Sequence, residues 1–208
     1  ELSLKTIYAH GSIGLPLAVI GYPLAIWIPA HYSGGLGISL ATVGTILMLA
    51  RFTDVISDPL MGEISDRWRT RFGRRKPWVL IGMPIMMIGV YKLFIPPDDV
   101  GIFYFLIYLT LFFLGSTIIA LPHRAWGAEL STDYHQRTAD GAGVGEVFTV
   151  LWQDAIGAFS GNFADKKIVD RATLTGPVLM GLAYTVILVL PVCVFIVLTF
   201  VKEPPPSN

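Results

Sequence analysis

Cysteine and charged side chains are scarce in this sequence. Its one cysteine, Cys193, lies in an apolar run, which excludes an internal disulfide framework and a cysteine metal cluster. Charged residues make up 14% of the 208 positions and hydrophobic residues 53%, a balance that an average water-soluble domain does not show. The formal net charge is zero, so it indicates neither an acidic nor a basic partner, and we expect no nucleic acid among the partners. Because hydrophobic residues greatly outnumber charged ones, most of the surface is predicted to face lipid.

Short motifs of catalysis and cofactor binding are also missing. The sequence shows no motif that pairs a nucleophile with a base, and its four histidines are scattered over different predicted helices or helix ends. These histidines are predicted to be satisfied or interfacial side chains and not metal ligands. The glycine-rich run 141–145 follows no predicted strand, so no nucleotide site is expected there. We predict that the chain is not an enzyme.

Long apolar runs are abundant by contrast. A membrane-spanning helix needs about 20 apolar residues, and polar or Pro/Gly segments separate runs of this length. The predicted fold is an all-α integral membrane bundle of six helices within residues 1–203. Its spans are predicted near 7–30, 38–61, 78–96, 101–122, 142–163 and 174–201. The first is expected to be a retained helix and not a signal peptide, because no small-residue cleavage site follows it.

The predicted fifth span is the weakest of the six. It carries Glu146, Gln153 and Asp154, and by hydropathy alone it also suits an interfacial helix. If it crosses the bilayer, these side chains should face the interior of the bundle, where polar groups are paired or hydrated.

Positive charges gather in one short connection between the second and third predicted spans. Such a cluster places a loop in the cytoplasm, so we expect a multi-pass protein of a bacterial inner (plasma) membrane with both termini cytoplasmic. The cluster comprises Arg67, Arg69, Arg71, Arg74, Arg75 and Lys76.

The second predicted span carries three ionisable residues, Arg51, Asp54 and Asp58, at spacings that place them on one helical face. Each costs roughly 2.5–3.5 kcal/mol near the bilayer centre, so this face should turn toward partners, water or a bound ion. Two carboxylates one turn apart repel each other, and a bound Na⁺ or proton would relieve that repulsion. The purely structural alternative pairs Arg51 with Asp54 and leaves Asp58 packed near the helix end beside Pro59.

The residues around this span also resemble a known family. The segment Gly62-Glu63-Ile64-Ser65-Asp66-Arg67, followed by Arg71-Phe72-Gly73-Arg74-Arg75-Lys76-Pro77-Trp78, resembles the loop motif between the second and third helices of the major facilitator superfamily. Joined to Arg51-x-x-Asp54-x-x-x-Asp58-Pro59-x-Met61-Gly62, it resembles the glycoside-pentoside-hexuronide:cation symporters, the melibiose permease-like family, in their N-terminal six-helix half.

The resemblance implies roles for particular residues. Asp54 and Asp58 would bind the coupling cation with help from Ser57 and Thr117, and Arg51 would be their charge partner. No other cofactor is expected. The residues that the resemblance assigns to the cytoplasmic loop motif, as a conformational latch, are Gly62, Asp66, Arg67, Gly73, Arg74, Arg75 and Lys76.

The sugar-binding positions of that family are not matched. Its first-helix acid would fall near Leu15 or Pro16, its fourth-helix acid near Ala120, and its fifth-helix Arg near Gly145. None of these side chains accepts a hydrogen bond from a sugar hydroxyl. The ion site is therefore expected without the melibiose-type sugar site, and the solute is a sugar-like or another small organic molecule.

Length separates two hypotheses. A complete transporter of this superfamily has two six-helix halves with substrate between them, whereas residues 204–208 begin a Pro-rich tail or central linker after one half. The leading hypothesis is half of a cation-coupled secondary transporter, in contact with the lipid bilayer, a second half and a small-molecule solute. The alternative is a non-transporting membrane subunit that scaffolds a larger complex.

Overall fold

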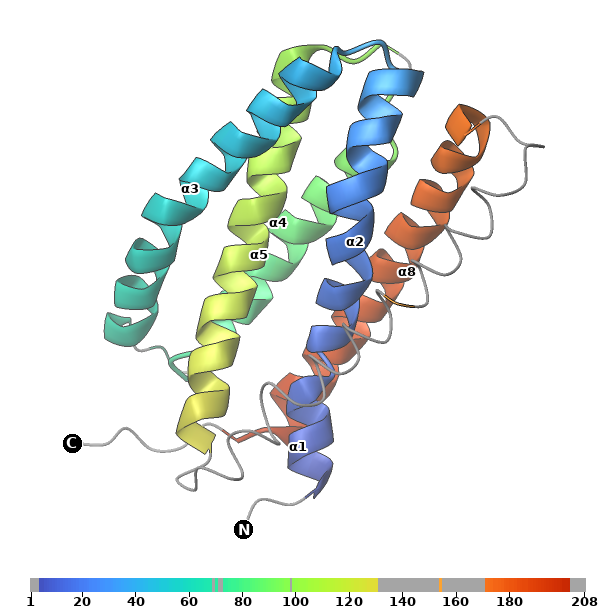
Figure 1. The fold of residues 1–208 in the computed structure, drawn as a ribbon. Helices are drawn as coiled ribbons and strands as arrows, with labels where there is room; N and C mark the ends of the chain where they lie inside the picture. Colours follow the sequence, from blue (N-terminus) through green and yellow to red (C-terminus); the bar gives the residue numbers. More distant parts are fainter. Residues whose placement is uncertain are drawn as a thin grey trace.

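The computed structural model describes residues 4–68, 70, 73–97, 99–130, 154 and 171–202 (Figure 1). All the named elements in this part of the chain are helical, which confirms the predicted all-α class. They are α1 (Leu4–Gly11), α2 (Gly14–Ala30), the π-helical turn η1 (His31–Gly35), α3 (Leu40–Arg67), α4 (Lys76–Phe94), α5 (Ile102–Leu130) and α8 (Arg171–Phe200).

Five helical segments of the described chain are long and apolar enough to cross a membrane. They correspond to the predicted first, second, third, fourth and sixth spans, so the chain is a multi-pass membrane protein. The predicted fifth span, 142–163, lies outside the described residues except for Asp154 and stays a prediction. The five segments are Lys5–Gly35, Leu40–Arg67, Lys76–Phe94, Ile102–Leu130 and Gly176–Phe200.

Helix α3 is longer than the span predicted for it. It begins after Ser39, whose Oγ accepts a hydrogen bond from the backbone N–H of Thr42 at 3.1 Å, a typical N-cap. It continues through Pro59 and ends only at Arg67. Gly62, Asp66 and Arg67 therefore lie on a helix and not in a loop, which corrects the sequence interpretation. Polarity marks where the bilayer ends, but a helix that enters water keeps its backbone hydrogen bonds.

Among the described helices, α4 and α5 make the closest backbone contacts. A Cβ on Gly115 would lie 2.5 Å from the backbone nitrogen of Met86, and one on Gly89 would lie 2.8 Å from Cα of Phe112. Small residues that let backbones approach are the usual means by which helices pack in membranes. These contacts fix the position of α5 against α4. They therefore also fix the positions of the α5 side chains that face α3.

The arrangement in space places several helix ends together. Figure 1 shows the start of α1, the end of α3, the start of α4 and the ends of α5 and α8 at one end of the bundle. Helix α5 packs against both α3 and α4, while α8 packs against α2 and α4. We call this the α3-terminal end, because the last turn of α3 marks it.

Candidate functional site

The first group of predicted site residues lies on α3 facing α5. Asp54 is largely buried, and its Oδ2 lies 3.4 Å from Nη1 of Arg51. The Arg51 side chain is mostly exposed, and its Cζ lies 4.4 Å from the centroid of the Phe113 ring. The guanidinium thus contacts a carboxylate and an aromatic face together.

Asp58, one turn further along α3, is held by a different helix. Thr117 of α5 donates a hydrogen bond from its Oγ1 to Oδ1 of Asp58 at 3.0 Å. The two residues are 59 positions apart in the sequence, and the tight α4–α5 packing holds Thr117 in place. The structure therefore places Thr117 beside Asp58, one of the acids with which the family resemblance grouped it.

Two oxygen atoms at this site have no hydrogen-bond partner among the described residues. They are Oδ1 of Asp54 and Oγ of Ser57, and both are buried. Buried polar atoms are nearly always hydrogen-bonded, so each exception calls for an explanation. We call Asp54, Ser57, Asp58 and Thr117 the carboxylate site; its donor set of carboxylate and hydroxyl oxygens is the kind that hard cations bind.

The predicted loop residues form a second polar cluster at the α3-terminal end. The Arg75 side chain is only 5% exposed and bonds three acceptors on two other helices. They are Oδ1 of Asp66 at 2.6 Å, Oγ of Ser65 at 2.9 Å and Oε1 of Glu129 at 2.8 Å. Arg74 also pairs with Glu129. We call Ser65, Asp66, Arg74, Arg75 and Glu129 the arginine network.

The remaining loop residues have separate roles. Lys76 donates to the carbonyl of Leu198 in α8 at 3.0 Å and lies 5.5 Å from the ring centroid of Trp126. Gly73 adopts φ 112°, a conformation that favours glycine, where the chain turns into α4. Arg67 does not join the network but pairs with Glu63 at 2.6 Å on the same helix. Of the network, Ser65 and Glu129 were not predicted as site residues.

A buried histidine pair joins α1 to α5 near the same end. His10 and His123 stack with ring centroids 3.9 Å apart, and each Nε2 lies within hydrogen-bond distance of the other residue's carbonyl oxygen, at 3.2 and 2.9 Å. The carbonyl of His10 is accessible because the helix breaks between α1 and α2, and Gly127 leaves room for the His10 ring. A separation of 113 residues conceals this pair in the sequence.

Some of the positions that correspond to the family's sugar-binding residues lie among the described residues. Pro16 is buried, and Leu15 and Ala120 are half-buried. None of the three has a polar side chain, so the described residues at these positions offer no side-chain contact to a sugar hydroxyl. Gly145 and Glu146 lie outside the described residues.

Fold and composition define an all-α, multi-pass membrane protein. A family model described as MFS/sugar transport protein matches residues 9–208. The chain belongs to this family, and the resemblance to the sugar–cation symporters of the major facilitator superfamily is confirmed.

Three relatives illustrate the similarity. An uncharacterized symporter of Synechocystis is 33% identical over 147 residues, which are 66% of this chain and 27% of the relative. The inner membrane symporter YicJ of Escherichia coli is 32% identical over 139 residues, 65% of this chain and 30% of the relative. The mouse sodium-dependent lysophosphatidylcholine symporter 1 is 27% identical over 141 residues, 64% of this chain and 26% of the relative. The matched segments thus span less than a third of these relatives' length.

Proposed function

We propose that the chain forms one half of a cation-coupled secondary transporter and binds the coupling cation at the carboxylate site. The observation that carries this proposal is the pair of buried oxygen atoms, Oδ1 of Asp54 and Oγ of Ser57, that lack hydrogen-bond partners among the described residues. They lie on one helix beside Asp58, which Thr117 already holds. A cation between the two carboxylates gives these oxygens a partner and offsets the repulsion of two negative charges one turn apart.

The donor set favours Na⁺ over a proton as this cation. A proton needs only one carboxylate oxygen, whereas two carboxylates and two hydroxyls provide the several oxygen ligands that a hard metal cation requires. The mouse relative is named as sodium-dependent, which supports the same choice. Arg51 then balances the negative charge that remains, since two carboxylates with one Na⁺ still carry one excess charge.

The rest of the transporter is part of the proposal. A second six-helix half would complete the solute path, and the arginine network would hold α3, α4 and α5 together as the halves move. Relatives are named for lysophosphatidylcholine and for glucuronides, so the names do not share one solute. We propose a small organic solute, an inner membrane location in bacteria and the α3-terminal end in the cytoplasm.

Thermal unfolding tests the cation site without knowledge of the solute. The polypeptide expressed from its complete reading frame is melted in NaCl and in choline chloride at equal ionic strength. A ligand that binds only the folded state stabilises it by about 2.7 kcal/mol at a concentration 100 times its Kd, so Tm should rise in Na⁺ alone. Asp54→Asn and Asp58→Asn should lose this rise, whereas Asp99→Asn, an exposed acid outside the site, should keep it.

Two results would contradict the sodium proposal. One is a Tm that rises by the same amount when NaCl or choline chloride is added. The other is a sodium-dependent rise in Tm that persists in both Asp54→Asn and Asp58→Asn. If Na⁺ has no effect, solute uptake driven by a pH gradient and lost in Asp58→Asn would assign the site to protons instead.

A further inference from the structure

An arginine on α5 has no ion-pair partner among the described residues. Arg124 is exposed, whereas Arg51, Arg67, Arg74 and Arg75 each contact a carboxylate. Helix α5 is apolar and long enough to cross a membrane up to Leu130. A cation at this position therefore needs water, an anion or the surface of the bilayer around it.

Arg124 lies on the face of α5 that meets the carboxylate site. Successive helical residues are rotated by roughly 100°, so Arg124, seven residues after Thr117, lies within about 20° of it around the helix. Thr117 donates to Asp58. Phe113, eleven residues before Arg124, also lies within about 20° of it and contacts Arg51. The helical rise places Arg124 about 10 Å beyond Thr117, toward the α3-terminal end.

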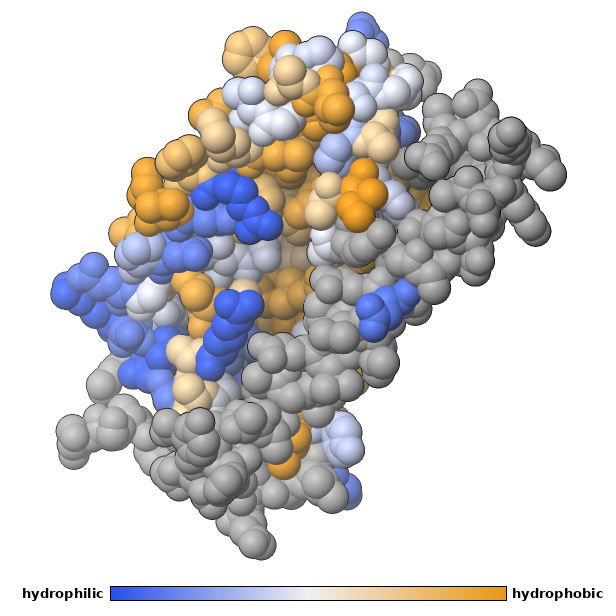
Figure 2. Space-filling view, in the orientation of Figure 1, coloured by the Kyte–Doolittle hydropathy of each residue, from blue (hydrophilic) through white to orange (hydrophobic). Residues whose placement is uncertain are grey.

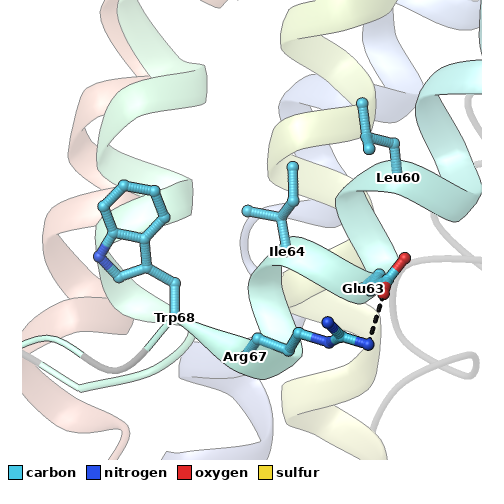
Figure 3. A pocket seen from close by; sticks show the side chains of 5 residues that line it. All are labelled: Leu60, Glu63, Ile64, Arg67 and Trp68. Atoms are coloured by element: carbon cyan, nitrogen blue, oxygen red, sulfur yellow. Dashed lines mark ion pairs between the residues drawn. The ribbon is translucent and has the colours of Figure 1, made fainter.

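Two other charged features of this end lie elsewhere. Glu129 of the arginine network follows Arg124 by five residues and so lies about 140° from it around α5. A pocket of about 610 Å³ is lined only by residues of α3 and the residue after it, and its cation Arg67 is paired with Glu63 (Figure 3). Figure 2 shows hydrophilic surface over the second half of α5 with hydrophobic surface beside it. Arg124 is therefore a separate cation.

The charges of the occupied carboxylate site do not balance that of Arg124. Asp54 and Asp58 carry two negative charges, and Arg51 and a bound Na⁺ carry two positive charges, so their sum is zero. A guanidinium keeps its proton in a protein. When a transporter closes around its solute and excludes water, an unbalanced charge on this face is costly. A solute with one negative group supplies the missing charge.

The same face offers few other polar contacts to a solute. Ala120, one turn before Arg124 and about 40° from it around the helix, is half-buried and apolar. Arg124 is thus the next polar side chain on this face after Thr117. Its guanidinium has paired N–H donors, which match the two oxygens of a carboxylate or phosphate. The chemistry of the face therefore favours an anionic group over a sugar hydroxyl.

We propose that Arg124 binds a phosphate or carboxylate group of the solute, which is therefore an organic anion. This inference rests on the proposed function, because the solute must pass the carboxylate site. Na⁺ and the anion attract each other over about 10 Å, so each should raise the affinity of the other by the same factor, roughly two- to tenfold. A cationic solute is repelled, and a neutral sugar leaves the charge of Arg124 unbalanced.

Thermal unfolding with inorganic phosphate as the probe tests this proposal. The complete polypeptide is delipidated in dodecyl maltoside, and Tm is measured as phosphate replaces chloride at constant ionic strength, in sodium and in choline salts. Phosphate stabilises folded proteins in general, so binding is the part of the rise in Tm that Arg124→Gln lacks. We expect this part to saturate with a Kd roughly two- to tenfold lower in sodium than in choline. Arg124→Lys, which keeps the charge, should retain some of it.

Lys5→Gln is the matched control, because it removes an exposed cation of α1 at the same end and should keep the full phosphate response. Arg124 is exposed, so Arg124→Gln should fold, which circular dichroism verifies. The proposal is overturned if Arg124→Gln responds to phosphate like the unchanged protein, or if Lys5→Gln loses as much of the response.

A lipid phosphate has the same chemistry, so phosphatidylglycerol is added to the micelles in a second arm. The proposal is also overturned if this lipid raises Tm through Arg124 and abolishes the phosphate response, because Arg124 then binds a headgroup. A rise in Tm with sodium but no Arg124-dependent response to phosphate overturns this inference alone. An Arg124-dependent response to phosphate without any sodium response supports the anion site and contradicts the proposed cation.

Discussion

The arginine network and the carboxylate site both place acids of α3 against α5, but their oxygen atoms have different surroundings. In the network, Asp66, Ser65 and Glu129 each contact the guanidinium of Arg75. In the carboxylate site, Thr117 holds Asp58 and Arg51 contacts Asp54 at 3.4 Å, while Oδ1 of Asp54 and Oγ of Ser57 have no hydrogen-bond partner among the described residues.

From this difference we infer that the arginine network maintains the fold, and we propose that the carboxylate site binds a ligand. Polar groups that satisfy one another stabilise one arrangement of the helices, and removing the buried Arg75 takes away the contact that joins the others. Polar groups that remain unsatisfied cost stability in the absence of a ligand. Substitutions in the network should therefore change unfolding, and substitutions in the carboxylate site should change cation binding.

The largest effect is expected at Arg75. Replacing it with Ala removes the common partner of three acceptors, but Asp66 is 57% exposed and can bind water instead, so the free energy of unfolding should fall by about 2 kcal/mol. Thermal unfolding of the complete polypeptide in detergent measures this change. Arg67→Ala is the matched control: its pair with Glu63 is exposed and should contribute less than about 1 kcal/mol. Equal losses in the two variants would contradict a structural role specific to the network.

The next effect concerns the packing that fixes Thr117. A Cβ on Gly115 would lie 2.5 Å from the backbone nitrogen of Met86, so Gly115→Ala should destabilise by about 1–3 kcal/mol. Because α5 must shift, the affinity for Na⁺ should fall as well. Gly44→Ala meets nothing within 4 Å and should instead stabilise by up to about 1 kcal/mol. A Gly115→Ala protein with unchanged melting and sodium affinity would show that this packing does not position Thr117.

The histidine pair should behave like the network on a smaller scale. His123→Phe removes a donor to the His10 carbonyl and should cost about 1–2 kcal/mol of unfolding free energy. His123→Gln, which keeps an N–H donor, should recover part of that loss. The sodium response should persist in both variants, because the pair lies outside the carboxylate site. A lost sodium response in a folded His123→Phe protein would mean that the two regions are coupled.

The smallest change in stability is expected at Ser57. Ser57→Ala removes a buried hydroxyl that has no described partner, so the folded protein without sodium should gain up to about 1 kcal/mol of stability. The affinity for Na⁺ should nevertheless fall about tenfold, which corresponds to about 1.4 kcal/mol. Thr53→Ala is the control, because its Oγ1 already donates to the carbonyl of Ala50 and should leave sodium affinity unchanged. Equal sodium affinities in the two variants would remove Ser57 from the site.

Much of the fold was predictable because lipid imposes strong constraints on a sequence. Spanning helices need long apolar runs, and the five described spans coincide with predicted runs that polar or Pro/Gly segments separate. The ends of α3 and α5 were less predictable. Each helix continues past the predicted span, α3 to Arg67 and α5 to Leu130, because a helix satisfies its own backbone in water as it does in lipid.

The candidate site was predictable where its residues share one helix. Arg51, Asp54, Ser57 and Asp58 are close in sequence, so helical spacing places them together. Contacts between helices are different: Glu129 pairs with arginines 54 and 55 positions away. An acid at the end of an apolar run, across from a basic cluster, is a signal that could have indicated it. The His10–His123 pair offers no such signal, since neither residue has a neighbour in sequence that marks its partner.

Equilibrium binding of radioactive sodium to the complete polypeptide tests the central claim most directly. The account predicts saturable binding at one site per chain, lost in Asp54→Asn and Asp58→Asn and retained in Asp99→Asn. Sodium binding that persists in both asparagine variants, or no sodium binding by the folded unchanged protein, would contradict the assignment of the carboxylate site to Na⁺.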